Sequence, residues 1–139
     1  MDKVIIVTGA SRGIGKEIAK TLSREGNIII ANYNKSEEDA RKLKEELEKE
    51  NLAIDIFKAD VSKREEAKEL VRFVLEKYKR IDVLINNAGI SENKLFTDVS
   101  DEDWNRIINT NLYSAFCMTQ EVLPNMIHNK SGNIINISS

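Results

Sequence analysis

The chain has 139 residues, 41% of them hydrophobic and 32% charged, and its 21 basic and 23 acidic residues leave a net charge of −2. This balance is ordinary for one globular domain, here residues 1–139, and no basic block of the kind that binds nucleic acid stands out. The longest apolar runs are too short to span a bilayer, and a single cysteine excludes an internal disulfide or a cysteine-based metal cluster. We therefore expect a cytoplasmic protein with no metal site and no nucleic-acid or membrane partner.

The expected elements alternate from strand to helix along the chain. Val4–Val7 is a nearly continuous apolar run, which predicts a parallel strand covered on both faces. The helix that follows has apolar residues at every fourth position and ends at Gly26, a residue type typical of the position after a helix. Ser36, and Ser62 together with Glu65, are expected to cap the next two helices. Further strands are expected at 28–30, 53–57, 83–85 and 134–137.

The longest expected helix starts at Ser100, where three acidic residues suit the positive end of the helix dipole. It runs toward Ile127 and contains Pro124, which predicts a kink or an early end because proline lacks an N–H group. The regular alternation predicts a doubly wound α/β sandwich of three layers with a parallel sheet. Right-handed crossovers give the strand order 3-2-1-4-5.

A glycine-rich turn, Thr8-Gly9-Ala10-Ser11-Arg12-Gly13-Ile14-Gly15, connects the first strand to the first helix. Glycines there let backbone N–H groups approach a pyrophosphate, and a Cβ at Gly13 or Gly15 would obstruct that approach or the packing of helix on strand. The alternative is that the glycines only make a tight turn. A Walker A loop is excluded, because Glu17 replaces the serine or threonine that holds magnesium and Ala10 replaces the first glycine.

The spacing T-G-x-x-x-G-x-G resembles that of the short-chain dehydrogenase/reductase superfamily. Two further motifs stand on the expected elements in the same order: Asn86-Asn87-Ala88-Gly89 after the fourth strand, and residues 132–139, Gly-Asn-Ile-Ile-Asn-Ile-Ser-Ser, at the fifth. The resemblance covers essentially the whole chain. It implies a Rossmann-type fold that stops before its last strands, and an NAD(P)-dependent carbonyl reductase that forms dimers or tetramers when intact.

The resemblance also implies a set of cofactor contacts. Asp60 would accept a hydrogen bond from the adenine amino group while Val61 lies against the ring, although Asp60 has the alternative role of capping the helix near Ser62. Asn86 has the alternative role of bonding neighbouring strands. The implied cofactor-binding residues are Thr8, Gly9, Ser11, Arg12, Gly13, Ile14, Gly15, Asn34, Asp60, Val61, Asn86, Asn87, Ala88 and Gly89.

Charges near the second strand favour NADP (NADPH) over NAD. Arg12 precedes the second glycine of the turn, where its forked guanidinium is placed to meet an adenosine 2′-phosphate. NAD-specific folds carry an acid near the end of the second strand, whereas residues 32–36 read Asn-Tyr-Asn-Lys-Ser and the first acid is Glu37. The alternative is that Arg12 and Lys35 are solvated surface charges.

Reductases of this superfamily resemble one another in using asparagine, serine, tyrosine and lysine, with the tyrosine as a general acid. Asn111 matches the asparagine and Ser139 the serine, with Ser138 as the alternative if the register shifts by one residue. None of the three tyrosines of the chain has a lysine four residues later. We therefore expect the catalytic set to be incomplete and the chain by itself to be inactive.

Substrate is the least constrained feature. The chain is similar to bacterial 3-oxoacyl-(acyl carrier protein) reductases, which use NADPH in fatty acid biosynthesis, and Leu95-Phe96-Thr97-Asp98 is similar to a branch that reduces a 5-aminopentanone modification on elongation factor P. The implied partner is a small or carrier-bound carbonyl substrate. A non-catalytic dinucleotide-binding fragment is the alternative. In either case the long helix is expected to leave apolar surface bare, which favours self-association.

Overall fold

The computed structural model describes residues 2–90 and 93–138. Five strands form one parallel sheet in the order β3-β2-β1-β4-β5, so the expected order is confirmed. Each expected strand is present, with ends that differ from expectation by up to three residues. The strands are β1 (Val4–Val7), β2 (Ile28–Tyr33), β3 (Ile54–Lys58), β4 (Val83–Asn86) and β5 (Asn133–Asn136).

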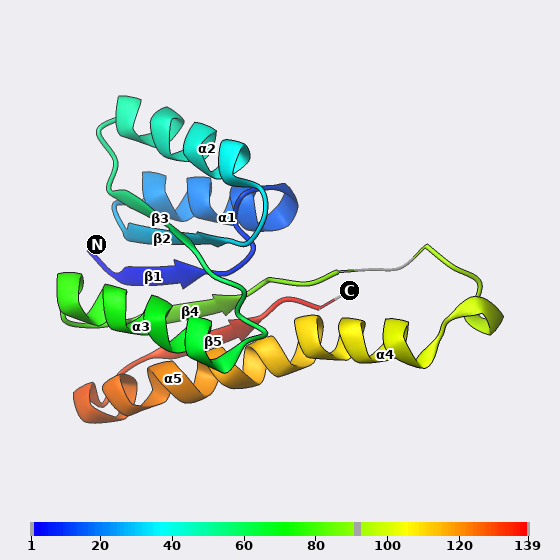
Figure 1. Ribbon diagram of the computed structural model, residues 1–139. Helices are drawn as coiled ribbons and strands as arrows, with labels where there is room; N and C mark the ends of the chain where they lie inside the picture. Colours follow the sequence, from blue (N-terminus) through cyan, green and yellow to red (C-terminus); the bar gives the residue numbers. More distant parts are fainter. Residues whose placement is uncertain (1, 91–92, 139) are drawn as a thin grey trace.

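Helices cover both faces of this sheet (Figure 1). Helices α1 (Gly13–Arg24) and α2 (Glu37–Lys49) lie on one face, and α3 (Arg64–Tyr78) and α5 (Ser114–Asn129) lie on the other. The arrangement is the expected three-layer sandwich. Over the described part of the chain, no helix combines the length and the apolar character needed to cross a membrane.

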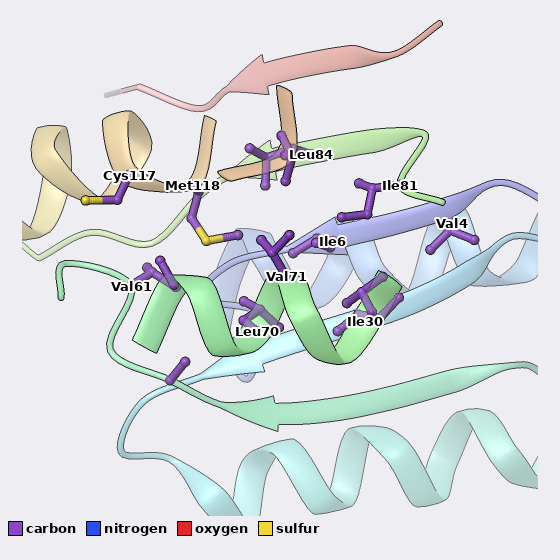
Figure 2. Close-up of a cluster of buried hydrophobic side chains, with 14 of the residues drawn as sticks. Val4, Ile6, Ile30, Val61, Leu70, Val71, Ile81, Leu84, Cys117 and Met118 are labelled. Atoms are coloured by element: carbon purple, nitrogen blue, oxygen red, sulfur yellow. The ribbon is translucent and has the colours of Figure 1, made fainter. Parts of the chain in front are cut away.

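Alternate residues of β1, β2 and β4 enter two separate apolar clusters. Ile6 and Ile30 pack with residues of α3 and α5 such as Leu70 and Met118 (Figure 2). Their neighbours in the strands, such as Ile29, pack instead with residues of α1 and α2. Burying one such side chain contributes about 1.5–3 kcal/mol. Burial on both faces is the reason why the strands are continuous apolar runs.

The helix ends agree with the sequence in two places and differ in a third. Gly26 follows the end of α1 with a φ of +91°, as expected for a C′ glycine. Ser36 is the N-cap of α2, although its side chain makes no capping hydrogen bond. The expected cap at Ser62 is wrong, because α3 begins only at Arg64. The Ser62 hydroxyl donates instead to the Asp60 carboxylate at 2.5 Å.

The long helical stretch contains a π-helical turn that the sequence does not reveal. After a short 3-10 turn, η1 (Phe96–Asp98), helix α4 (Asp101–Ile108) begins with a reciprocal cap between Ser100 and Asp103. A π-helical turn, η2 (Asn109–Tyr113), then leads directly into α5. An early end at Pro124 is wrong, since α5 continues to Asn129. Contacts beyond the proline hold it: Met126 is buried, and Asn125 Oδ1 accepts from Ile81 N at 3.0 Å.

Candidate functional site

A cavity of about 790 Å³ opens at the carboxyl ends of the strands. In an open α/β sheet, ligands bind outside these ends where the chain connections reverse direction, which here is between β1 and β4. The volume lies within the usual range for small-molecule sites. Five segments line it: residues 9 and 11–13 after β1, 32–36 at the end of β2, 59–62 after β3, 87–90 after β4, and Arg106, Asn109 and Thr110 of α4 and η2.

Most of the residues expected to touch a cofactor line this one cavity. The structure brings together there Gly9, Ser11, Arg12, Gly13, Asn34, Asp60, Val61, Asn87, Ala88 and Gly89. Four other residues of this set lie outside the lining, namely Thr8, Ile14, Gly15 and Asn86, and so does Asn111, which was expected in catalysis. Ser139 is outside the described residues.

The glycine turn is shaped by close packing at one glycine and by backbone conformation at another. A Cβ on Gly15 would lie 2.4 Å from the carbonyl oxygen of Gly9, so only glycine allows α1 to pack on the turn. A Cβ on Gly13 would meet nothing within 4 Å, but the φ of Gly13 is +59°, a region that other residues rarely adopt. The expectation of obstruction therefore holds for packing at Gly15, while Gly13 faces open space.

Helix α1 presents its N-terminus to the cavity without a side-chain cap. The N-cap residue, Arg12, has an extended backbone, and its side chain makes no capping hydrogen bond. The structure describes every residue of α1, and the first turn of the helix holds no acidic residue. Helices α2 and α3 also lack a side-chain cap but carry acidic residues in their first turns, and α4 is capped by Ser100 Oγ, which accepts from Asp103 N at 3.0 Å. Uncapped N–H groups and the positive end of the dipole together favour an anion. The start of α1 is therefore suited to a phosphate group.

Thr8 and Asn87 tie the glycine turn to the loop after β4. Thr8 Oγ1 accepts hydrogen bonds from the backbone N–H groups of Asn87 and Ala88, both at 2.9 Å. Asn87 Nδ2 donates in return to Gly9 O at 3.0 Å. Thr8 is 1% exposed, so it acts as a frame for the cavity walls and has no surface left for a ligand.

Asn32 is part of this frame, a role that its sequence motif did not indicate. Its Oδ1 accepts from Gly9 N at 3.3 Å, and its Nδ2 donates to Ala59 O at 3.0 Å and Phe57 O at 3.3 Å. The side chain therefore connects the glycine turn to the end of β3. A polar amide at the end of an otherwise apolar strand was the available signal, because a buried amide must find partners.

Asp60 closes a local turn at the edge of the cavity. Its Oδ1 accepts from the backbone N of Ser62 at 3.1 Å and from the Ser62 hydroxyl, and its own N–H donates to Glu66 Oε1 at 2.9 Å. The alternative role as a helix cap is thus replaced by a turn that precedes α3. Val61 beside it is 4% exposed and gives the cavity an apolar wall.

Arg12 stands at the mouth of the cavity with its side chain 75% exposed. Its Nε lies 3.8 Å from Asp39 Oδ2, an acid in the first turn of α2. Glu37, the first acid after β2, accepts from Tyr33 OH at 3.4 Å and pairs with Arg41 at 3.3 Å. Burial and the nearby Glu37 carboxylate raise the pKa of Tyr33.

A second cation, Arg106, reaches the cavity from α4. Asp103, which is 5% exposed, accepts from Arg106 at 3.1 Å, from Lys94 at 2.7 Å and from the backbone N of Ser100 at 3.0 Å. The hydrogen bond from Lys94 and that from the Ser100 backbone lower the pKa of Asp103. The carboxylate thus joins the segment before α4 to the helix and positions Arg106 at the rim.

Asn86 takes the alternative, structural role. It is buried, and its Nδ2 donates to Asn136 Oδ1 at 2.9 Å and to Thr119 Oγ1 at 3.3 Å, joining β4 to β5 and α5. Ile14 is exposed and lies along a different hollow, an apolar groove that it shares with Ile135 and Ile137 of the β5 region. These two positions therefore contact protein surfaces away from the cavity.

Asn111 lies in the π-helical turn, directly beside the loop after β4. Its Oδ1 accepts from Ile90 N at 2.7 Å, and its Nδ2 donates to Ile90 O at 2.8 Å. Both ends of the side-chain amide thus have backbone partners, although the residue is exposed. Ser138, the alternative to Ser139, is exposed just after β5.

Comparison with known proteins agrees with this geometry. A family model described as short chain dehydrogenase matches residues 3–139. The chain is 39% identical over its whole length to a 3-oxoacyl-(acyl-carrier-protein) reductase FabG of Staphylococcus epidermidis, of which it covers 57%. It is 42% identical over 137 residues, 99% of this chain, to the protein of the same name from Thermotoga maritima, of which it covers 55%. The chain thus spans little more than half the length of these relatives and corresponds to their N-terminal portion.

Proposed function

The chain belongs to the short chain dehydrogenase family, and we propose that it is the cofactor-binding portion of an NADPH-dependent carbonyl reductase. The observation that carries the proposal is the uncapped N-terminus of α1, which meets the glycine turn at a cavity of about 790 Å³. A dinucleotide fits these features, because its pyrophosphate is an anion and Gly13 leaves open space beside it.

The other walls of the cavity provide the remaining contacts to the cofactor. Asp60 and Val61 provide an acceptor and an apolar wall for adenine, and Ala88 and Gly89 let the loop after β4 approach a ribose. Arg12 and Asn34 line the mouth, where a 2′-phosphate would meet the guanidinium in a charge-assisted hydrogen bond. The described residues of β2 place no acid in this lining, which supports NADP over NAD.

The bound cofactor supplies a hydride for carbonyl reduction. For the chain's own residues, we propose that Asn111 supports a proton relay and that Ser139 donates a hydrogen bond to the substrate carbonyl. A tyrosine general acid with its lysine would have to come from outside these 139 residues, because the sequence holds no Tyr-x-x-x-Lys.

The proposed substrate is a 3-oxoacyl thioester on an acyl carrier protein, in keeping with the names of the relatives. Fold alone does not fix a substrate. A 5-aminopentanone modification on elongation factor P is the alternative substrate, and a non-catalytic dinucleotide-binding chain is the alternative function. The missing Tyr-x-x-x-Lys favours the non-catalytic function for the chain by itself. We propose a dimer or tetramer for the intact protein.

Calorimetric titration of the 139-residue chain with NADPH and NADH tests the cofactor site. We expect NADPH to bind about tenfold more tightly, which corresponds to about 1.4 kcal/mol. Equal affinities would contradict the NADP assignment, and absence of binding by a folded chain would contradict the site. To test the reaction, the chain is joined to the C-terminal portion of the Thermotoga maritima relative and assayed with a 3-oxoacyl thioester, a 5-aminopentanone-modified substrate and NADPH.

A further inference from the structure

Asn32 has an unusual number of partners for one side chain. It is 2% exposed and stands near the end of β2, with the cavity on one side and the end of β3 on the other. Its Oδ1 accepts from Gly9 N, and its Nδ2 has three backbone oxygens within reach: Ala59 O at 3.0 Å, and Phe57 O and Tyr33 O at 3.3 Å. Both ends of the amide are thus engaged by protein.

The partners of Asn32 belong to two different walls of the cavity. Gly9 starts the glycine turn, whereas Ala59 immediately precedes Asp60 and Val61. The backbone of Asn32 strengthens the first connection, since its carbonyl accepts from Ala10 N at 2.9 Å. Together with the hydrogen bond from Ala59 N to Tyr33 O at 2.9 Å, these contacts of Asn32 fix the distance between the phosphate-side and adenine-side walls.

We propose that Asn32 is a positioning residue that makes the two halves of the dinucleotide site act as one. The inference rests on the proposed function, in which the glycine turn meets the pyrophosphate and the loop with Asp60 meets adenine. A ligand that contacts both walls gains from a fixed separation, because the loss of freedom on binding is reduced in advance. A ligand that contacts only one wall gains nothing from it.

The test compares probes that span the cavity with probes that do not. The spanning probe is 2′-phosphoadenosine 5′-diphosphoribose, and the one-sided probes are adenosine and inorganic pyrophosphate. Asn32→Ala should weaken the spanning probe about tenfold and change the one-sided probes less than twofold, as measured by NMR titration of the 139-residue chain. A uniform weakening of all three probes would reduce Asn32 to a structural role and overturn the proposal.

Asn27→Ala is the matched control. Asn27 is a buried asparagine next to the other end of β2, where its Nδ2 donates to Leu22 O at 3.0 Å and its Oδ1 accepts from Lys3 N at 3.3 Å. Its loss should lower stability and leave all three affinities unchanged. An equal effect of the two variants on the spanning probe would also overturn the proposal.

A measurement on the wild type covers the case in which Asn32→Ala does not fold. In the wild type, the Asn32 Nδ2 protons should exchange at least tenfold more slowly than those of the exposed Asn105. Equally fast exchange of the two amides would contradict the hydrogen bonds of Asn32 Nδ2 and overturn the proposal. If no probe binds the folded wild-type chain, the proposed function fails. The exchange rates test the hydrogen bonds of Asn32 independently of any ligand.

Discussion

Asn111 and Ile90 form a closed pair of hydrogen bonds, in which the side-chain amide of one residue engages both backbone groups of the other at 2.7 and 2.8 Å. The pair joins the π-helical turn to the loop after β4. Gly89 lies beside it, since a Cβ there would be 3.0 Å from Asn111 Oδ1. Single π turns inside α-helices occur frequently at functional sites. Here the turn brings a mid-helix amide to the loop that lines the cavity.

Removing this amide should release the loop. In Asn111→Ala, the Ile90 amide should exchange at least tenfold faster, and the free energy of unfolding should fall by about 1 kcal/mol, since each exposed hydrogen bond contributes modestly. Hydrogen exchange followed by NMR measures the first effect and urea unfolding the second. Asn105→Ala, an exposed asparagine of α4, is the control and should change neither quantity. Unchanged Ile90 exchange in Asn111→Ala would contradict the pairing.

Arg12 should discriminate between the two nicotinamide cofactors. Arg12→Ala should weaken NADPH at least tenfold and leave NADH within twofold, because hydrogen bonds to charged groups contribute about 1.5–3 kcal/mol. Fluorescence titration of both cofactors measures the ratio. Arg41→Ala removes an exposed arginine that pairs with Glu37 and does not line the cavity, so its ratio should remain that of the wild type. A parallel loss of NADH affinity in Arg12→Ala would contradict the assignment.

The strand order and the position of the glycine turn could be predicted because they depend on local patterns. Strands buried on both faces are continuous apolar runs such as Val4–Val7, and a turn that must pack as Gly15 does tolerates no other residue. Burial of a strand depends on the helix layer that covers it, and packing at a glycine of the turn depends on residues close to it in the chain.

Features for which local signals mislead, or which depend on distant partners, could not be predicted. Ser62 and Glu65 have the spacing of a helix cap, yet the Ser62 hydroxyl donates to the Asp60 carboxylate and α3 begins only at Arg64. The continuation of α5 past Pro124 depends on Asn125 reaching Ile81 N, 44 residues away. The Asn32 side chain likewise bonds to Gly9 and Ala59, which lie 23 and 27 positions away from it in the chain.

The two glycines of the turn should respond differently to alanine. Gly15→Ala places a methyl group 2.4 Å from a backbone oxygen, so we expect a loss of about 3 kcal/mol in unfolding free energy together with loss of cofactor binding. Gly13→Ala meets open space and carries only the strain of its φ of +59°, about 1 kcal/mol. Urea unfolding of both variants measures the difference. Equal losses would show that packing at Gly15 is not the dominant constraint.

Asp55 should make the stability of the chain depend on acidic pH. The residue is buried on the edge strand β3, where Lys77 Nζ donates to it at 2.9 and 3.1 Å and Tyr78 OH donates as well. Burial disfavours its charged form, but the hydrogen bonds from Tyr78 and Lys77 outweigh burial and lower the pKa of Asp55 below the ordinary value of 3.8. The ionised carboxylate therefore stabilises the fold fully above that value, and the contribution is lost as pH falls below it.

Asp55→Asn should make the free energy of unfolding depend less on pH in the acidic range. At pH 7 the variant should be about 1 kcal/mol less stable than the wild type, a modest figure because Lys77 is half exposed. The difference should shrink steadily below pH 3.8. Urea unfolding between pH 2 and pH 7 measures both curves, with Glu45→Gln, an exposed carboxyl of α2, as the control. A constant difference at every pH would show that the Asp55 charge does not contribute.

The apolar groove beside α1 should make the 139-residue chain self-associate. Its volume is about 860 Å³, and its walls include Ile18 and Leu22 of α1 and Ile85, Ile135 and Ile137 of the sheet region. On the opposite face, α5 exposes Phe116 and Ile127. Apolar side chains exposed in this groove favour association with a second copy. Sedimentation velocity should therefore show an average sedimentation coefficient that rises with chain concentration, and a concentration-independent monomer would contradict this.

Charges placed in the groove identify the contacting surface. The double variant Ile14→Glu with Ile137→Glu should shift the association to at least tenfold higher concentration, because each glutamate would have to be buried without a partner. Phe96→Glu is the matched control: Phe96 is 91% exposed on η1, away from the groove, so this variant should associate like the wild type. If Phe96→Glu dissociates the chain and the groove variant does not, the contact lies at η1, and the groove has no part in it.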